Sequence, residues 1–202
     1  MPAHRAEVLF SLLWESSCGF HKDSTYIAKV DFWRDVLPEK MHHDLCNGKN
    51  GSRFSHSYEK GGIVKDYTER NIVEVSSKQL LADAPSLRLG RYYPSSLVHR
   101  QLNRFRGDTR PFRVVQVSAE SCFLDTNHPL SGKKLTVQSE IVRIHPPAAQ
   151  RGGQLNDIAE VICGNGPGMQ APLPDSRETL YGRYPFIRNN TKSEEEFYSS
   201  PR

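Results

Sequence analysis

Hydrophobic and polar residues alternate over several short stretches of this chain, and a period of two is typical of half-buried β-strands. Glu7 to Trp14 is an apolar run of β-forming residues, and Thr25 to Phe32 alternates in the manner of a strand. Turn-forming residues separate such stretches, as in Ser118 to Ser121. The pattern predicts strands over residues 7–14, 25–32, 53–58, 71–75, 110–117, 122–125 and 135–144.

One stretch predicts a helix. It covers residues 35–46, with Pro38 near its start and Asn47-Gly48 as the left-handed cap that would end it. From Ser76 the pattern becomes less regular, and the segment ends at the turn-prone pair Tyr93-Pro94.

The last quarter of the chain differs in composition. Beyond Pro147 it is rich in glycine and proline and carries an acidic run at residues 194–196. We therefore expect residues 147–202 to be a linker or an incompletely packed extension. Within them, Val161 to Gly168 has the pattern of a strand followed by a glycine-rich turn. Too little chain follows for a nucleotide-binding fold, and the abrupt end leaves open a further domain after residue 202.

Composition limits the class of protein. The chain has 202 residues and a mass of 23.0 kDa, which is room for one medium domain or two small ones. No apolar run reaches the roughly 18 residues of a membrane span. The four cysteines are widely separated, so free thiols in a reducing, cytoplasmic compartment are expected. His42 and His43 would point about 100° apart on a helix, so we expect no metal site, and no pattern indicates a cofactor.

Positive charge is concentrated in one segment. The net charge is +4, yet between Arg88 and Arg113 seven arginines face a single acid, Asp108. The same segment contains the aromatic residues Tyr92, Tyr93, Phe105 and Phe112. It would suit a nucleic acid, with the phosphates on the arginines and the bases stacked on the aromatic rings. A solvated arginine face is the other interpretation.

The most specific motif is Phe123 to Leu135, with the sequence FLDTNHPLSGKKL. It resembles the D-x-N-H-P-L-A-G-K-x-L signature of SlyD-like FKBP-type prolyl isomerases, in which the chain returns from a domain inserted in the flap to the last strand of the FKBP sheet. Lys22-Asp23-Ser24 and Val36-Leu37-Pro38 resemble further segments of that family, in the same order along the chain. The resemblance covers residues 6–146.

The resemblance implies an α+β fold, in which an antiparallel FKBP-like sheet wraps on a short helix and carries a small β-rich domain inserted in its flap. Residues 6–75 and 127–146 would form the FKBP-like domain, and residues 76–126 the insert. The implied activity is cis-trans isomerisation of peptidyl-prolyl bonds. Its rotational barrier of about 18–20 kcal/mol is lowered by a desolvating apolar pocket, without a nucleophile, metal or cofactor.

The resemblance also implies which residues line the prolyl pocket. Asp23 would be the acid beside it, and Trp14 stands where the family usually has tyrosine. Val64 and Val137 replace a hydrogen-bonding tyrosine and an aromatic residue of the family, which leaves open a chaperone or peptide-binding module with weak or lost isomerase activity. The full implied set is Asp23, Trp14, Phe32, Val36, Leu37, Met41, Val64 and Val137.

In that family the insert binds unfolded chains through exposed apolar surface. The residues expected to contact such clients are Leu97, Val98, Leu102, Phe105 and Phe112. The expected partners are therefore unfolded or proline-containing proteins, with nucleic acid as the alternative ligand of the arginine-rich segment.

Overall fold

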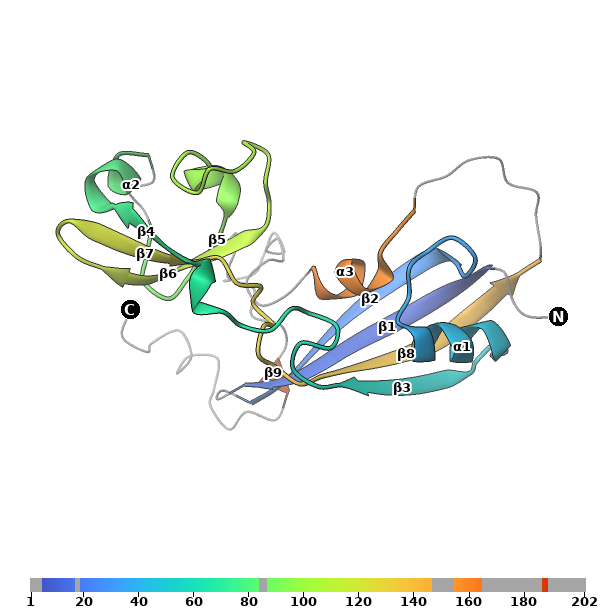
Figure 1. Cartoon of the computed structure of the whole chain (residues 1–202). Coiled ribbons are helices and arrows are strands. Elements are labelled where there is room, and N and C mark those ends of the chain that lie inside the picture. Colours follow the sequence, from blue (N-terminus) through green and yellow to red (C-terminus); the bar gives the residue numbers. More distant parts are fainter. Residues whose placement is uncertain (1–4, 17–18, 84–86, 147–154, 165–186, 189–202) are drawn as a thin grey trace, which may run out of the picture. The chain divides into compact units, whose positions relative to one another are not determined.

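The structure is a computed structural model that describes residues 5–16, 19–83, 87–146, 155–164 and 187–188. These residues form two antiparallel sheets and three short α-helices (Figure 1), a mixed architecture compatible with the predicted α+β class. The chain divides into two compact units. Val64–Gly132 belongs to the second unit, and the described residues before and after it belong to the first. Over the described ranges, no helix has the length and apolar character needed to cross a membrane.

The first unit contains a five-stranded sheet in the order β3-β8-β1-β2-β9. Its helices are α1, which packs against β3, and α3, which packs against β1. The elements are β1 (Arg5–Ser16), β2 (Gly19–Asp31), α1 (Glu39–Asn47), β3 (Arg53–Tyr58), β8 (Leu135–His145), α3 (Ile158–Cys163) and β9 (Ile187–Arg188).

Strand β1 lies between β2 and β8, and its alternation defines the buried face of this sheet. Val8, Phe10, Leu12 and Trp14 are at most 3% exposed, whereas the residues between them face the other side. Both neighbouring ladders shift register near Val8. Such bulges let each neighbouring strand keep its apolar residues on the buried face although the spacing changes there.

Helix α1 begins at Glu39, four residues later than the sequence predicted. Leu37 precedes a proline, which disfavours helical backbone at that position, and Val36 is held in an isolated β-bridge. Met41 and Leu45 are fully buried and lie one turn apart, so they form the face of α1 that packs on the sheet.

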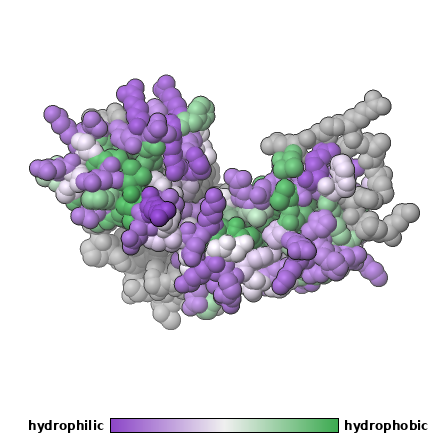
Figure 2. Space-filling model, viewed as in Figure 1, coloured by the Kyte–Doolittle hydropathy of each residue, from purple (hydrophilic) through white to green (hydrophobic). Residues whose placement is uncertain are grey.

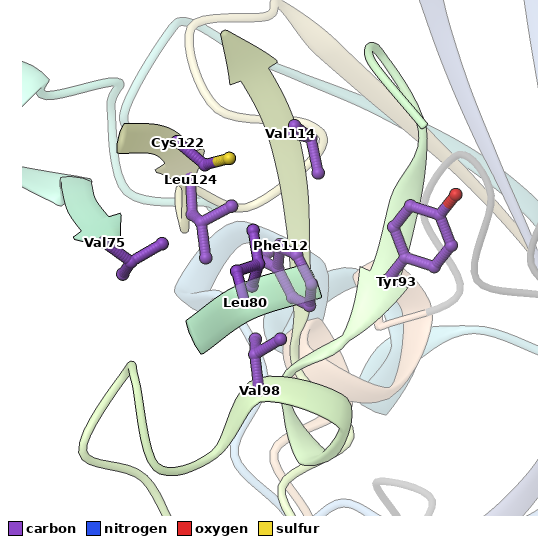
Figure 3. Packing of buried hydrophobic residues seen from close by; sticks show 8 residues of the cluster. All are labelled: Val75, Leu80, Tyr93, Val98, Phe112, Val114, Cys122 and Leu124. Atoms are coloured by element: carbon purple, nitrogen blue, oxygen red, sulfur yellow. The ribbon is translucent and has the colours of Figure 1, made fainter. Parts of the chain in front are cut away.

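The second unit contains a four-stranded sheet in the order β4-β7-β6-β5. Figure 3 shows the core on one face of it, where the side chains of Leu80 and Val98 approach Phe112. Because β4 pairs with β7, the compact unit begins before residue 76. The sequence analysis assigned no element to α2 or β5, which are both short. The elements are β4 (Ile72–Ser76), α2 (Ser77–Asp83), β5 (Tyr92–Pro94), β6 (Pro111–Val117) and β7 (Ser121–Asp125).

The motif after β7 ties the exit of this unit to its entrance. Asn127 is 3% exposed, and its side-chain amide donates to the carbonyl oxygen of Thr68 over 2.9 Å and to Oδ1 of Asp125 over 2.8 Å. Its side-chain oxygen accepts from the Thr68 backbone N–H at 3.1 Å and from Nδ2 of Asn71 at 3.0 Å. One buried amide therefore clamps two segments that are far apart in the sequence.

We predict that Asn127→Ala lowers the unfolding free energy of the second unit by about 2–4 kcal/mol, because the substitution removes four hydrogen bonds made by a buried amide, one of them to buried Asp125. Asn47→Ala is the control, since Asn47 is exposed and makes one side-chain bond to the carbonyl of His43; its effect is expected within about 0.5 kcal/mol. Urea unfolding measures both. Equal effects of the two substitutions would contradict the role of Asn127 as a clamp.

Candidate functional site

Several of the predicted pocket residues of the first unit lie on one face of its sheet, which we call the helix-covered face. On this face, three rows of directly paired residues cross the sheet in the strand order β3, β8, β1 and β2. One residue of these rows is His56 on β3, whose Nε2 lies 3.0 Å from Oδ2 of Asp44 on α1. Helix α1 therefore covers this face. The rows are Tyr58–Leu135–Trp14–His21, His56–Val137–Leu12–Asp23 and Phe54–Ser139–Phe10–Thr25.

Trp14 forms an aromatic pair at one end of this face. Its ring stacks on that of His21, with centroids 5.1 Å apart and planes inclined by 6°, and both residues are buried. Asp23 lies in the neighbouring row and is half-buried; its Oδ1 accepts from the backbone N–H of Ser24. The predicted acid and the predicted aromatic wall are therefore on the same face, in adjacent rows.

Of the other predicted pocket residues, Val137 lies in the same row as Asp23, and the rest lie off the three rows. Phe32, Met41 and Val137 are at most 4% exposed, and Leu37 is half-buried. Val64 belongs to the second unit. Trp33, next to Phe32, is 84% exposed, so Phe32 is the buried aromatic residue of the two.

The backbone of Val36 pairs with a segment from the C-terminal part of the chain. The N–H of Val36 donates to the carbonyl of Asn156 over 2.9 Å, and the N–H of Ile158 donates to the carbonyl of Val36 over 3.0 Å. Together they make a parallel bridge between Val36 and Asp157. Asn156 also donates from its backbone and its side chain to Oδ1 of buried Asp35, at 3.2 and 3.1 Å.

Helix α3 follows this bridge, where the sequence pattern predicted a strand. Val161 to Cys163 are helical, although their pattern indicated a strand, and Ile158, Ile162 and Cys163 are at most 2% exposed, although the region was expected to be a linker or incompletely packed. The signal that was missed is the pair Asp157 and Glu160. Asp157 Oδ1 accepts from the Glu160 N–H at 3.1 Å as an N-cap, and an acid at the cap with Glu three residues later marks a helix start.

The helix-covered face also holds polar atoms that lack a partner within the described residues. The hydroxyl of Tyr58, Nδ1 of His56 and Oγ of Ser139 are all fully buried. Burial raises the pKa of Tyr58, and it raises the pKa of the Cys163 thiol to about 12. Cys163 therefore stays protonated at neutral pH, and the groups gathered here suit binding and desolvation better than nucleophilic chemistry.

The opposite face of the same sheet has a shallow groove of about 540 Å³. Leu9, Ser11 and Lys22 line it together with the ion pair between Arg53 and Glu140, whose Nε and Oε2 are 3.0 Å apart. The alternation of the strands separates this groove from Trp14 and Asp23. It contains none of the residues predicted for the prolyl pocket.

In the second unit, the residues predicted to contact clients divide into core and surface. Val98 and Phe112 are fully buried, and Leu102 is packed against the same core. Leu97 and Phe105 are 42% and 79% exposed and offer apolar surface to a partner. Figure 2 shows hydrophilic side chains over much of the visible surface of this unit, with hydrophobic patches between them.

Part of the arginine-rich segment serves the fold of the second unit. Asp108 is 9% exposed; its Oδ2 lies 2.7 Å from Nη2 of Arg110 and 3.5 Å from Nη1 of Arg104. The hydrogen bonds from Arg110 lower the pKa of Asp108 to about 2. Arg113 pairs with Asp125 at 3.2 Å and lies over the ring of Tyr92. Nucleic-acid binding by the remaining exposed arginines stays a prediction.

Within the described ranges, no cluster of three or more His, Cys, Asp or Glu side chains is arranged to hold a metal ion. Cys46, Cys122 and Cys163 are free thiols, and Cys18 lies outside the described residues. No protein-family model matches the chain, and no curated protein is significantly similar to it.

We predict that Asp108→Asn destabilises the second unit by about 1–3 kcal/mol at pH 7. The folded-state pKa of Asp108, about 2, lies below its ordinary value of 3.8. The ionised carboxylate of Asp108 therefore stabilises the fold in full when the pH is well above 3.8, its pKa in the unfolded state. This stabilisation is lost as the pH falls towards 2. Unfolding of both proteins between pH 7 and pH 2 measures it, with Asp66→Asn, an exposed site, as the control. A difference that does not shrink with falling pH would exclude the ion pairs as its source.

Proposed function

We propose that the chain is a SlyD-like, FKBP-type peptidyl-prolyl cis-trans isomerase that binds its protein clients on the helix-covered face of the first unit. The observation that carries the proposal is the backbone of Val36. Its N–H and carbonyl pair with residues 156 and 158, which lead into α3, and α3 packs against β1, the strand that carries Trp14. Pairing of an extended segment through main-chain hydrogen bonds is a general mode of peptide recognition.

Rotation about a prolyl bond requires no nucleophile, metal or cofactor on such a face. The twisted state loses amide resonance, and an apolar surface that removes water from the imide favours it. Trp14, Phe32, Met41 and Val137 would provide that surface once it is open, and Asp23 is the polar group in the neighbouring row. The high pKa of Cys163 fits a reaction without a nucleophile.

We further propose that the first sheet is FKBP-like and that the second unit is the domain inserted in its flap. Two observations support this. The second unit is continuous in the described sequence from Val64 to Gly132, between two segments of the first. The motif that carries the resemblance contains Asn127, which joins the exit of that unit to its entrance.

A peptide-binding module without efficient catalysis is the second candidate. It is favoured by Val137, a small and fully buried residue at the position where the family has an aromatic side chain. A smaller side chain contacts a prolyl ring less closely and stabilises its twisted state less.

We predict that the protein accelerates a refolding reaction limited by proline isomerisation and that Asp23→Ala lowers kcat/KM about 10-fold or more. Lys22→Ala is the matched control, because Lys22 is the adjacent residue of β2 and lines the groove on the opposite face. Its activity should equal that of the wild type. A folded wild-type protein that does not accelerate refolding would favour the binding module.

We also predict that the double substitution Leu97→Ser and Phe105→Ser weakens suppression of client aggregation several-fold without unfolding the second unit, because both side chains are exposed. The control is Val117→Ser, which changes an exposed apolar residue of β6 that is not among the expected client contacts. Light scattering of an aggregating client protein measures the effect. Unchanged suppression by the double variant would exclude this surface of the second unit as an additional site that binds unfolded clients.

A further inference from the structure

Helix α3 and the bridge before it occupy the helix-covered face in the manner of a bound peptide. We infer that residues 155–164 are a displaceable ligand held in cis, and that the same face binds peptides of similar chemistry in trans. This inference rests on the proposed function, because it places the client site where α3 lies. It adds a ligand class and a regulatory step, since α3 must leave before a client can bind.

The polar end of this ligand is recognised by specific contacts. Asp35 is 7% exposed. One of its carboxylate oxygens binds the end of β2, and the other binds residues 155–164. Oδ2 accepts from the N–H of Asp31, and Oδ1 accepts twice from Asn156. A buried carboxylate that receives both the backbone and the side-chain N–H of one residue selects an asparagine-like side chain at that position.

The apolar end is a single short helix. Ile158, Ile162 and Cys163 are buried, whereas Val161 is 41% exposed. Ile158 and Ile162 are four residues apart and lie on the same side of the helix, so this side of α3 packs on the sheet and the side with Val161 faces solvent. The ligand class is therefore a peptide with asparagine followed, two, six and seven positions later, by apolar residues.

The attachment of α3 is weak compared with that of the sheet below it. An isolated helix needs about 12–15 residues to be stable in water, and α3 has six, so it is helical because it is packed. Within the described residues, the backbone–backbone bonds that join residues 155–164 to the rest of the unit are the two at Val36, and Asn156 adds two bonds to the carboxylate of Asp35. Strand β1 is bonded along most of its length on both sides. Segments with few such bonds open without global unfolding.

The surface beneath α3 contains groups suited to a second occupant. Tyr58 lies near Cys163 of α3, because repulsion between the ionised forms of the two groups adds to burial in raising the pKa of Tyr58. The buried hydroxyl of Tyr58 has no hydrogen-bond partner within the described residues. When α3 leaves, this hydroxyl becomes available to water or to a backbone group of an incoming peptide, which reduces the cost of exposing the face.

The test uses the full-length protein and a fluorescent peptide of residues 154–165 in which the cysteine is replaced by alanine, which keeps an apolar side chain at that position. Ile162→Asp puts a carboxylate on the buried side of α3, and Val161→Asp puts one on its exposed side. We expect Ile162→Asp to bind the peptide at least ~30-fold more tightly than the wild type, because its site is no longer occupied. Val161→Asp should match the wild type. Fluorescence anisotropy measures the affinities, and circular dichroism checks the sheets.

A milder variant keeps the inference testable if Ile162→Asp does not fold. Asn156→Ala removes the side-chain bond to Asp35 and leaves the apolar contacts, and it should tighten peptide binding ~3–10-fold. The same substitution made in the peptide should weaken its binding by a similar factor. A folded, opened variant that binds the peptide no better than the wild type overturns the inference.

The binding measurement also separates this inference from the proposed isomerase activity. Tight peptide binding by Ile162→Asp without acceleration of proline-limited refolding would support the cis ligand and refute the isomerase. Equal isomerase activity in the wild type and in both aspartate variants, with no gain in peptide binding, would refute the cis ligand alone.

Discussion

The first unit depends on the alternation of side chains along β1. This strand is hydrogen-bonded on both sides, and from Val8 to Trp14 every second side chain is buried. A slip of one residue would turn all of these side chains to the opposite face, so the hydrophobic effect fixes the register of β2 and β8 as well. Because the ladders are continuous, they also align Trp14 with His21 and Leu12 with Asp23. The candidate site follows from this register.

The sequence predicted the elements that have a strong local pattern. β3 has the predicted bounds, and β1, β2 and β8 are each longer than predicted at one end or both. Hairpin partners extend each other through hydrogen bonds that no single-strand pattern records. The start of α1 was placed too early, because its first predicted turn is held by contacts of Asp35 and Val36 with residues 156–158, which are distant in the sequence.

The site could be predicted only in part. The pattern of β1 put Trp14 on an apolar strand, and the resemblance of the chain to a known family suggested Asp23. The same reasoning could not show that Val36 pairs with Asn156, because the composition of the C-terminal region indicated a linker. The N-cap Asp157 and the glutamate three positions later, Glu160, were visible in the sequence. They are a weak signal by themselves, since a helix of six residues is stable only when it is packed.

If residues 155–164 are a displaceable ligand, α3 opens independently of the sheet on which it packs. Native-state hydrogen exchange tests it directly at the amides of Val36 and Ile158, which donate the two bonds of the bridge. We expect protection at least about 2 kcal/mol below that of the β1–β8 ladder and nearly independent of low denaturant concentration, as in local opening. Protection equal to that of the ladder, with the same denaturant dependence, would show that α3 leaves only when the unit unfolds and would contradict the account.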